Sequence, residues 1–374
     1  MNPIIKWPGG KSRELKQILP LIPAYDRYLE PFFGGGALFF HLAPKAAAVN
    51  DVSSALMEFY ALVKARDSGL HRLLLCYDSS FRTLVRACDR RMDALLPLYA
   101  ALKEGRLSGE QLRAALEGIA AELADELAPA FGPELLPDRD LFCGDLCGMA
   151  ADKFVRTVKN AEKKPFSAED LRENLLTGFT SGYYMHFRRI FNDLALGRAA
   201  GRSPQYRAAN FYFIREYCYG SMFRYNAAGE FNIPYGGMSY NRKDLEGKIA
   251  AMFSAETAAL FSGAQLHCAD FEEFLARVRP TGRDFLFLDP PYDTDFSDYE
   301  GRAFGRADQE RLAAVLRATP ARFILVIKNT AFIRSLYEGQ FRILSFDKQY
   351  TYNVRSRNDR DVEHLIITNL PPKN

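Results

Sequence analysis

A continuous apolar run near the middle of the segment "RDFLFLDPPY" constrains the fold of this chain more than any other feature. A strand that is apolar on both faces belongs inside a sheet that is covered on both sides, as parallel sheets are. The run ends abruptly at Asp289, and two prolines follow it. The segment therefore predicts a buried central strand whose end carries a rigid polar turn.

The N-terminal part of the chain indicates the same kind of sheet. "RYLEP" is a short apolar strand, "FFGGG" is a glycine turn, "ALFFHLA" begins a helix, and "AAAVND" is a second strand. This succession is a βαβ unit, which implies parallel pairing of its two strands.

From Phe253 onward the alternation of strands and helices returns. "GAQLHCADF" and "ARFILVIKNT" are predicted strands, and "ADQERLAAVLRAT" is a predicted helix. "FRILSFDKQY" and "VEHLIITNL" are two further strands, and the loop between them is too short for a crossover helix, so they must pair as a hairpin. We therefore predict an α/β fold with a mostly parallel sheet and one antiparallel member, interrupted in the sequence by a long insertion.

The insertion is mainly helical, from about residue 52 to residue 191. Its clearest helix lies in "SGEQLRAALEGIAAELADELAP", where Ser108 and Gln111 fit a capping box. Pro129 is expected to end this helix, and the Pro-rich "FGPELLPDRD" is expected to be a loop.

Charge is divided unevenly over the insertion, although the whole chain carries only +3. From Asp89 to Asp140 there are 11 acidic and 6 basic residues, and from Asp152 to Arg207 there are 11 basic and 6 acidic residues. One face turned toward a polyanion and another turned away would produce this division, and so would two solvated helical faces.

Other features place the chain among ordinary folded proteins. No apolar run reaches the roughly 18 residues of a membrane span, and the N-terminus lacks the apolar core of a signal peptide. The six cysteines have no disulfide spacing, and the pair in "CGDLC" lacks the second pair of ligands that a zinc site needs. We expect a cytoplasmic protein without a metal and without a membrane partner.

The segment "KWPGGKS" at residues 6–12 ends like a phosphate-binding loop. Such a loop needs a glycine five residues before Gly10, and that position holds Ile5. It also needs a buried strand upstream, and only five residues precede Lys6. An NTPase built on this segment is therefore disfavoured.

Open α/β sheets bind ligands at the carboxyl ends of their strands. Four predicted strands end in suggestive residues, which are Glu30 with the glycine turn, Asp51, Asp270 and Asp289. Asp51 follows Gly34 at about the spacing at which nucleoside-binding folds place an acid on ribose hydroxyls. A nucleoside-containing cofactor is favoured, and a dinucleotide oxidoreductase would leave the turn at Asp289 unexplained.

The turn Asp289-Pro290-Pro291-Tyr292 carries the most specific chemistry. Two prolines remove two backbone donors and fix φ, so Pro290 presents a rigid carbonyl beside the Asp289 carboxylate. Two adjacent acceptors suit an exocyclic amino group, and Tyr292 offers a face on which a planar base can stack. A purely structural turn is the alternative, and it is less expected after so apolar a strand.

Five segments, taken in order, make the chain resemble a known family. They are "KWPGGK", "EPFFGGG", "ND" at the second strand end, "YGSMFRYNAAGEFNIPYGG" and "DPPY". The chain looks like the Dam-type DNA adenine N6-methyltransferases of the D12 class and alpha group. The resemblance implies a seven-stranded class I methyltransferase sheet that binds S-adenosylmethionine, formed by residues 1–56 and 245–374, with an inserted target-recognition domain at residues 57–244.

The same resemblance implies roles for individual residues. Lys11 would lie near the carboxylate of S-adenosylmethionine, opposite the strand end that carries Asp289, and Asp51 would bind the ribose. The implied cofactor-binding residues are Trp7, Lys11, Phe32, Gly34, Gly36, Asp51, Asp270, Phe271 and Asp289. The implied catalytic residues, which would hold the target adenine, are Asp289, Pro290 and Tyr292. The loop Tyr352–Asn358 would cover that base from the far side.

The segment "YGSMFRYNAAGEFNIPYGG" would then be a hairpin that reads DNA sequence. Arg224 is the candidate for a bidentate contact to a guanine edge, and pairing with an acid or a phosphate is the alternative. Tyr219 and Met222 would wedge into the duplex, and Asn226 and Pro234 complete the implied DNA-binding set. Gly220 stands where the Dam proteins have a polar reader, so the resemblance implies a site that contains G and A and leaves open whether that site is GATC.

Together these patterns predict methyl transfer to N6 of an adenine that is flipped out of double-stranded DNA, through alignment and electrostatics. The expected partner is double-stranded DNA, in the cytoplasm and nucleoid of a bacterium or from a phage. A cognate restriction endonuclease that acts separately is left open. An RNA or protein methyltransferase on the same fold is the alternative, because a fold alone does not fix the substrate. Lys11 and Asp289 argue against an idle DNA-binding module.

Overall fold

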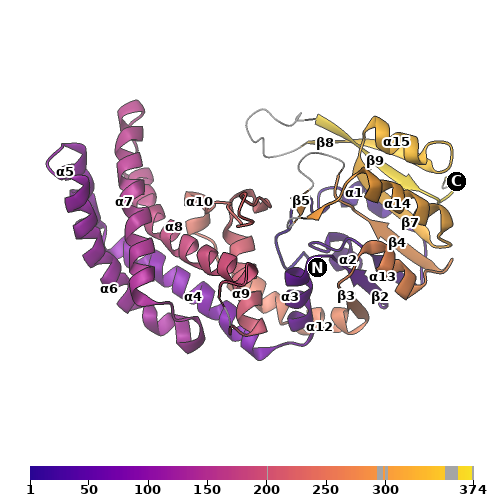
Figure 1. The fold of residues 1–374 in the computed structure, drawn as a ribbon, viewed down its shortest axis with the longest axis horizontal. Helices are drawn as coiled ribbons and strands as arrows, with labels where there is room; N and C mark the ends of the chain where they lie inside the picture. The colour runs from indigo at the N-terminus through magenta and orange to yellow at the C-terminus, as the bar shows by residue number, and fades with distance from the viewer. Residues whose placement is uncertain (200, 293–297, 300–301, 350–360, 373–374) are drawn as a thin grey trace. The chain divides into compact units, whose positions relative to one another are not determined.

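The computed structural model describes residues 1–374 except 200, 293–297, 300–301, 350–360 and 373–374 (Figure 1). The chain divides into two compact units. The sheet unit consists of Met1–Ala65, Phe223–Tyr225 and Ser254–Asn374, and the helical unit consists of Arg66–Met222 and Asn226–Phe253. The helical unit is thus an insertion in the sequence of the sheet unit.

A seven-stranded sheet forms the centre of the sheet unit, with strand order β3-β2-β1-β4-β7-β9-β8. Its strands are β1 (Arg27–Glu30), β2 (Ala47–Asn50), β3 (Ala264–His267), β4 (Asp284–Leu288), β7 (Arg322–Lys328), β8 (Arg342–Gln349) and β9 (Asp361–Thr368). Strands β3, β2, β1, β4 and β7 pair in parallel, and β9 is antiparallel to both β7 and β8. The predicted mostly parallel sheet with one antiparallel member is therefore confirmed, and so is the pairing of the last two strands. A separate short pair joins β5 (Asp298–Tyr299) to β6 (Arg302–Ala303).

Helices cover the sheet, which explains the continuous apolar runs of its strands. The helices of this unit are α1 (Leu15–Ile18), η1 (Leu19–Leu21), α2 (Ala37–Leu42), α3 (Ser54–Lys64), α12 (Ala255–Ser262), α13 (Phe271–Val278), α14 (Arg306–Ala318) and α15 (Ala331–Tyr337). In β4, Leu286 and Leu288 join the core that α13, α14 and α15 complete. Phe285 points to the opposite side, as expected from alternation along a strand, and packs on Tyr25 and Tyr28.

The helical unit is held together by buried aromatic rings. Its helices are α4 (Ser68–Arg90), α5 (Met92–Lys103), α6 (Gly109–Leu135), α7 (Arg139–Lys163), α8 (Ala168–Ala195), α9 (Pro204–Tyr217), η2 (Tyr219–Ser221), α10 (Met238–Asn241) and α11 (Glu246–Met252). Tyr77 of α4 stacks on Phe213 of α9 at a centroid distance of 4.8 Å, and Tyr183 of α8 stacks on Phe131 of α6 at 6.0 Å. None of the helices that the structure describes has both the length and the hydropathy required to cross a bilayer.

The end of α6 differs from the prediction. The capping box of Ser108 and Gln111 is present, but the helix continues through Pro129 to Leu135. The chain bends at Gly132, which has φ +65° and ψ 170°, and the predicted loop is reduced to the residues between Leu135 and Arg139. Burial of Leu127, Phe131 and Leu135 on the core outweighs the hydrogen bond that the proline cannot make.

Candidate active site

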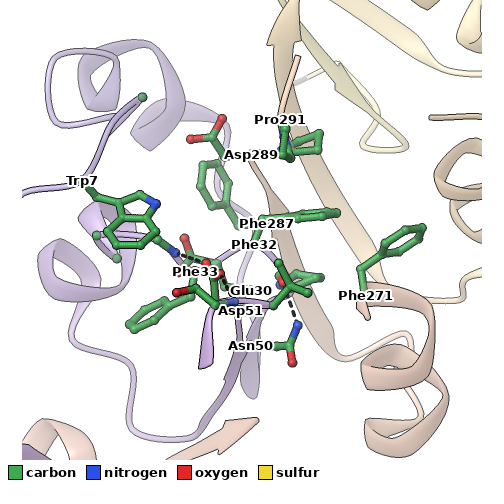
Figure 2. A pocket seen from close by; sticks show the side chains of 18 of the residues that line it. Trp7, Glu30, Phe32, Phe33, Asn50, Asp51, Phe271, Phe287, Asp289 and Pro291 are labelled. Atoms are coloured by element: carbon green, nitrogen blue, oxygen red, sulfur yellow. Dashed lines mark hydrogen bonds between the residues drawn. The ribbon is translucent and has the colours of Figure 1, made fainter. Parts of the chain in front are cut away.

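The carboxyl ends of β1, β2 and β4 border one pocket of the sheet unit. The sequence-predicted residues that line it are Trp7, Lys11, Phe32, Gly34, Gly36, Asp51, Asp270, Phe271, Asp289, Pro290 and Tyr292. Figure 2 shows Trp7 and Phe271 on opposite sides of this pocket, with Glu30 and Asp51 between them. The fold therefore brings together every residue that was predicted to bind the cofactor or to hold the target base.

The glycine turn after β1 forms a floor against Trp7. Gly34 has φ +48°, and a Cβ atom there would lie 2.6 Å from Cδ1 of the Trp7 ring. Gly36 has φ +64°, and its Cβ would lie 2.6 Å from the Phe33 ring. Glycine is therefore required at both positions for two reasons, the left-handed backbone and the lack of space.

Asp51 fixes the other side of this turn. Its Oδ2 accepts a hydrogen bond from the Gly34 amide at 2.8 Å, and its Oδ1 accepts one from the Ser53 amide at 2.9 Å. Burial raises the pKa of the Asp51 carboxyl, although these backbone donors act in the opposite direction. Each oxygen keeps a further lone pair for a ligand hydroxyl, since a carboxylate oxygen can accept two hydrogen bonds.

Lys11 is held against the turn that follows β4. Its Nζ forms an ion pair with Asp289, donates to the Gly9 carbonyl at 3.0 Å, and lies 3.2 Å from the Tyr292 hydroxyl. The lysine side chain is only 2% exposed, whereas that of Asp289 is 19% exposed. The prediction that the opening stretch lies opposite the Asp289 strand end is therefore wrong, because the carboxylate that Lys11 meets is that of Asp289.

Two residues that sequence reasoning missed hold this turn from behind. Gln309 of α14 is fully buried, and its Nε2 donates to the Pro291 carbonyl at 2.8 Å. His364 of β9 packs edge-on against the Tyr292 ring at a centroid distance of 5.3 Å. The only signal for Gln309 was its position on the same helical face as Leu312 and Leu316, where an apolar residue is usual.

Aromatic rings make a wall on the side of α13. Phe32, Phe271 and Phe304 lie with their ring centroids 5.5 to 5.9 Å apart. Asp270 caps α13 and forms an ion pair with Arg311 at 2.7 Å, while the Arg311 guanidinium lies 4.9 Å from the centre of the Phe271 ring. The wall is apolar, with its rings tilted or edge-on to one another, and its polar end at Asp270 and Arg311 is exposed to solvent.

A buried polar layer supports the pocket from below. Glu30 is 2% exposed and accepts a hydrogen bond from the Tyr28 hydroxyl at 2.8 Å. Burial raises the pKa of the Glu30 carboxyl well above its usual range. Asn50, which belongs to the "ND" pair but was given no role of its own, donates to the carbonyls of Pro31 and Ala269 and so ties β1 to the segment before α13.

The predicted sequence-reading segment doubles back on itself without forming a regular strand. The Tyr219 amide donates to the Pro234 carbonyl, and the Asn226 amide donates to the Glu230 carbonyl, both at 2.9 Å. Tyr219 and Arg224 are exposed, and Met222 is half-buried. The Asn226 side chain is used inside the turn, where it accepts from the amides of Ala228 and Glu230.

Phe223 connects this segment to the pocket. Its ring meets the Trp7 ring edge-on at a centroid distance of 4.9 Å, and Phe223–Tyr225 belong to the sheet unit. Sequence reasoning missed this contact, since nothing in either motif indicates a partner so far along the chain. The predicted loop Tyr352–Asn358 lies outside the described residues.

Comparison with known proteins agrees with this geometry. The chain matches the family of D12 class N6 adenine-specific DNA methyltransferases over residues 7–82 and 153–352. It is 24% identical to the type II methyltransferase M.CviBI of Paramecium bursaria Chlorella virus NC1A, over 99% of this chain and 100% of that protein. It is 22% identical to the type II methyltransferase M1.LlaDCHI of Lactococcus lactis subsp. cremoris, over 99% and 95% of the two chains. A retron Ec67 DNA adenine methylase of Escherichia coli is 35% identical over 36% of this chain and 45% of its own length.

The family match spans more than half of the chain and includes all the residues that line the pocket. The seven-stranded, mostly parallel sheet is the arrangement expected of a class I methyltransferase, a fold that is generally associated with S-adenosylmethionine. The chain therefore belongs to the D12 class of N6 adenine-specific DNA methyltransferases.

Proposed function

We propose that the pocket binds S-adenosylmethionine between Trp7 and Phe271, and that Asp289, Pro290 and Tyr292 hold the target adenine at its edge. The single observation that carries this proposal is the convergence of all the predicted cofactor and base residues on one pocket. The glycine floor admits a ligand close to the backbone, the Asp51 oxygens suit ribose hydroxyls, and the ring wall suits adenine.

In the proposed reaction the protein contributes alignment and hydrogen-bond acceptors. When bound, S-adenosylmethionine supplies a methyl group on a positively charged sulfur. Asp289 and the Pro290 carbonyl would accept hydrogen bonds from the N6 amino group and direct its lone pair toward that methyl group, and after transfer N6 would lose a proton to the Asp289 carboxylate or to water. Lys11 orients Asp289 through their ion pair. Its predicted contact with the cofactor carboxylate would require Lys11 to exchange one of its three partners.

The base must leave the duplex to reach this turn, at a cost of a few kcal/mol for unstacking. Stacking on Tyr292, whose ring is backed by His364, offsets part of that cost. We further propose that Tyr219, Met222 and Arg224 contact DNA, and that Asn226 and Pro234 shape their segment rather than read bases. The recognition domain at 57–244 and a separately acting restriction endonuclease remain predictions.

The test is methyl transfer from labelled S-adenosylmethionine to DNA of mixed sequence, followed by mapping of the modified adenines. The expected result is N6-methyladenine in one short sequence context. Folded protein that binds the cofactor and labels RNA or protein instead of DNA would contradict the proposal.

A further inference from the structure

The C-terminal half of α7 carries a basic ridge, defined as Lys153, Arg156, Lys159, Lys163 and Lys164. At 100° per residue, Arg156, Lys159 and Lys163 lie within about 60° of one another around the helix axis. These three side chains and that of Lys164 are exposed, and Lys153 is half-buried. Arg156, Lys159 and Lys163 therefore form one row of positive charge along α7, the helix labelled in Figure 1, and Lys153 and Lys164 lie beside that row.

These cations are not neutralised within the described part of the chain. No ion pair joins any of the five to a carboxylate there, although Asp152 begins the same helical face. The Arg156 Nε donates to the backbone carbonyl of Asp152 at 3.3 Å rather than to its carboxylate. Burial, together with the charge of Arg156, lowers the pKa of Lys153, which agrees with a positive potential along the row.

Favourable interaction with the helix dipole explains the presence of cations only at the C-terminal end of this row. Cations in the last turn of a helix offset its negative C-terminus, and Lys163 and Lys164 occupy that position. Lys159 and Arg156 lie one and two turns earlier, where the effect of the dipole has faded. A ligand of opposite charge accounts for all of them.

A second copy of the chain offers a poor ligand for the ridge. The acid-rich stretch Asp89–Asp140 is the obvious complementary surface, but many of its carboxylates are already in ion pairs with arginines. Those in ion pairs are Asp89, Glu104, Glu122, Asp125, Glu126 and Glu134. A nucleic-acid backbone keeps its full charge, and the family assignment supplies DNA as the substrate.

We propose that the basic ridge of α7 binds phosphates of duplex DNA, as a contact surface additional to the segment that carries Arg224. The inference rests on the proposed function for its ligand. From Arg156 to Lys163 the row is about 10 Å long, at 1.5 Å per residue, which corresponds to two or three phosphates. Phosphates carry no sequence information, so the ridge contributes affinity and salt dependence but no site choice.

The test compares two triple variants that change the net charge equally. The ridge variant is Arg156→Ala/Lys159→Ala/Lys163→Ala, and the control is Arg90→Ala/Arg106→Ala/Arg139→Ala, whose arginines are exposed and ion-paired. Affinity for one duplex is measured over a salt series, with circular dichroism to verify folding. The ridge variant should bind roughly 10 to 100 times more weakly at low salt, with its salt slope reduced by about two to three. The control should bind like the wild type.

Three readouts separate the possible outcomes. Equal affinities and slopes for the two variants would overturn the proposal. Wild-type dimerisation in light scattering that only the ridge variant abolishes, with unchanged DNA binding, would assign the ridge to a second copy and also overturn it. Mapping of methylated adenines tests site choice separately from affinity. A ridge variant that still methylates the same adenines at saturating DNA supports contacts to the DNA phosphates. Failure of the wild type to form N6-methyladenine would concern the proposed function alone.

Discussion

Charged side chains are arranged in opposite ways in the two units. In the pocket of the sheet unit, Lys11, Asp289 and Asp51 converge, and each is fixed by hydrogen bonds with neighbouring groups. In the helical unit, many charged side chains lie on helix surfaces: some pair between helices, as Arg90 and Glu126 do, and others form the ridge of α7, which makes no ion pair within the described part of the chain. The buried Glu216, which pairs with two lysines, is an exception. Converging, sheltered groups can align a reaction, whereas exposed charges of one sign can only attract a partner.

This difference leads to a general expectation. Substitutions around the pocket should change the rate of methyl transfer or cofactor binding, whereas substitutions at Arg224 or on the ridge of α7 should change site choice or DNA affinity. The following experiments test that division or sharpen the account of the pocket.

The largest effect is expected for Asp289→Ala. The variant removes the acceptor proposed for N6 and the partner of Lys11, so kcat should fall at least roughly 10²–10³-fold while cofactor affinity is largely kept. Single-turnover kinetics and calorimetric titration with S-adenosylmethionine measure the two quantities. Asp26→Ala, which removes an exposed carboxylate paired with Arg283, is the control. A variant that loses cofactor binding instead would show that Asp289 has another role.

Arg224→Ala should change site choice more than rate. Loss of a bidentate contact to guanine would reduce discrimination at one position by roughly 1–3 kcal/mol. Sequencing of methylated sites across a random library measures this, with Arg198→Ala, an exposed arginine paired with Asp193 and Glu230, as the control. An unchanged sequence profile would refute the assignment.

Gly34→Ala should weaken cofactor binding by about tenfold. The left-handed backbone costs roughly 1–2 kcal/mol for any other residue, and the new methyl group must displace Trp7. Gly339→Ala is a matched control in the same unit, because Gly339 has φ +76° with no atom within 4 Å of the added Cβ. If both variants bind the cofactor equally well, Trp7 is not part of the binding surface.

Gln309→Met should lower kcat about fivefold, with the KM for the cofactor nearly unchanged. The Pro291 carbonyl would lose its buried donor, at a cost of about 1 kcal/mol or more, and the turn that carries Asp289 would be held less firmly. Leu312→Ala, on the same helix, should lower the melting temperature but not kcat. If Gln309→Met instead lowered the melting temperature and left kcat unchanged, as expected for Leu312→Ala, Gln309 would contribute only to packing of the core.

The smallest effect concerns Glu30 and pH. Because burial raises the pKa of Glu30 in the folded protein, the folded chain binds a proton that the unfolded chain has released. Stability from this group is present below the unfolded pKa and is lost as pH rises through the folded pKa. The free energy of unfolding, measured with urea, should therefore fall less between about pH 5 and about pH 8 in Glu30→Gln than in the wild type. The exposed Glu338→Gln is the control, and equal losses in all three proteins would contradict the prediction.

Strand ends were predictable because their signals are local. The apolar run before Asp289 and the glycines after β1 each specify strand, turn and burial within a few residues. Parallel pairing then brings those ends to one edge of the sheet, so the pocket followed from the sequence pattern. The end of α6 was not predictable in this way, since burial of distant side chains decided whether Pro129 ended the helix.

The sequence by itself determined the order of the main strands and helices, the split of the sheet by the helical insertion, and the strand-end residues that line the pocket. Only the tertiary structure decided which groups touch. Lys11 meets Asp289, which lies 278 positions further along the chain, Gln309 supports the Pro291 carbonyl, and Phe223 contacts Trp7. These contacts depend on side-chain packing between distant segments, and hydrophobic periodicity contains no information about such partners.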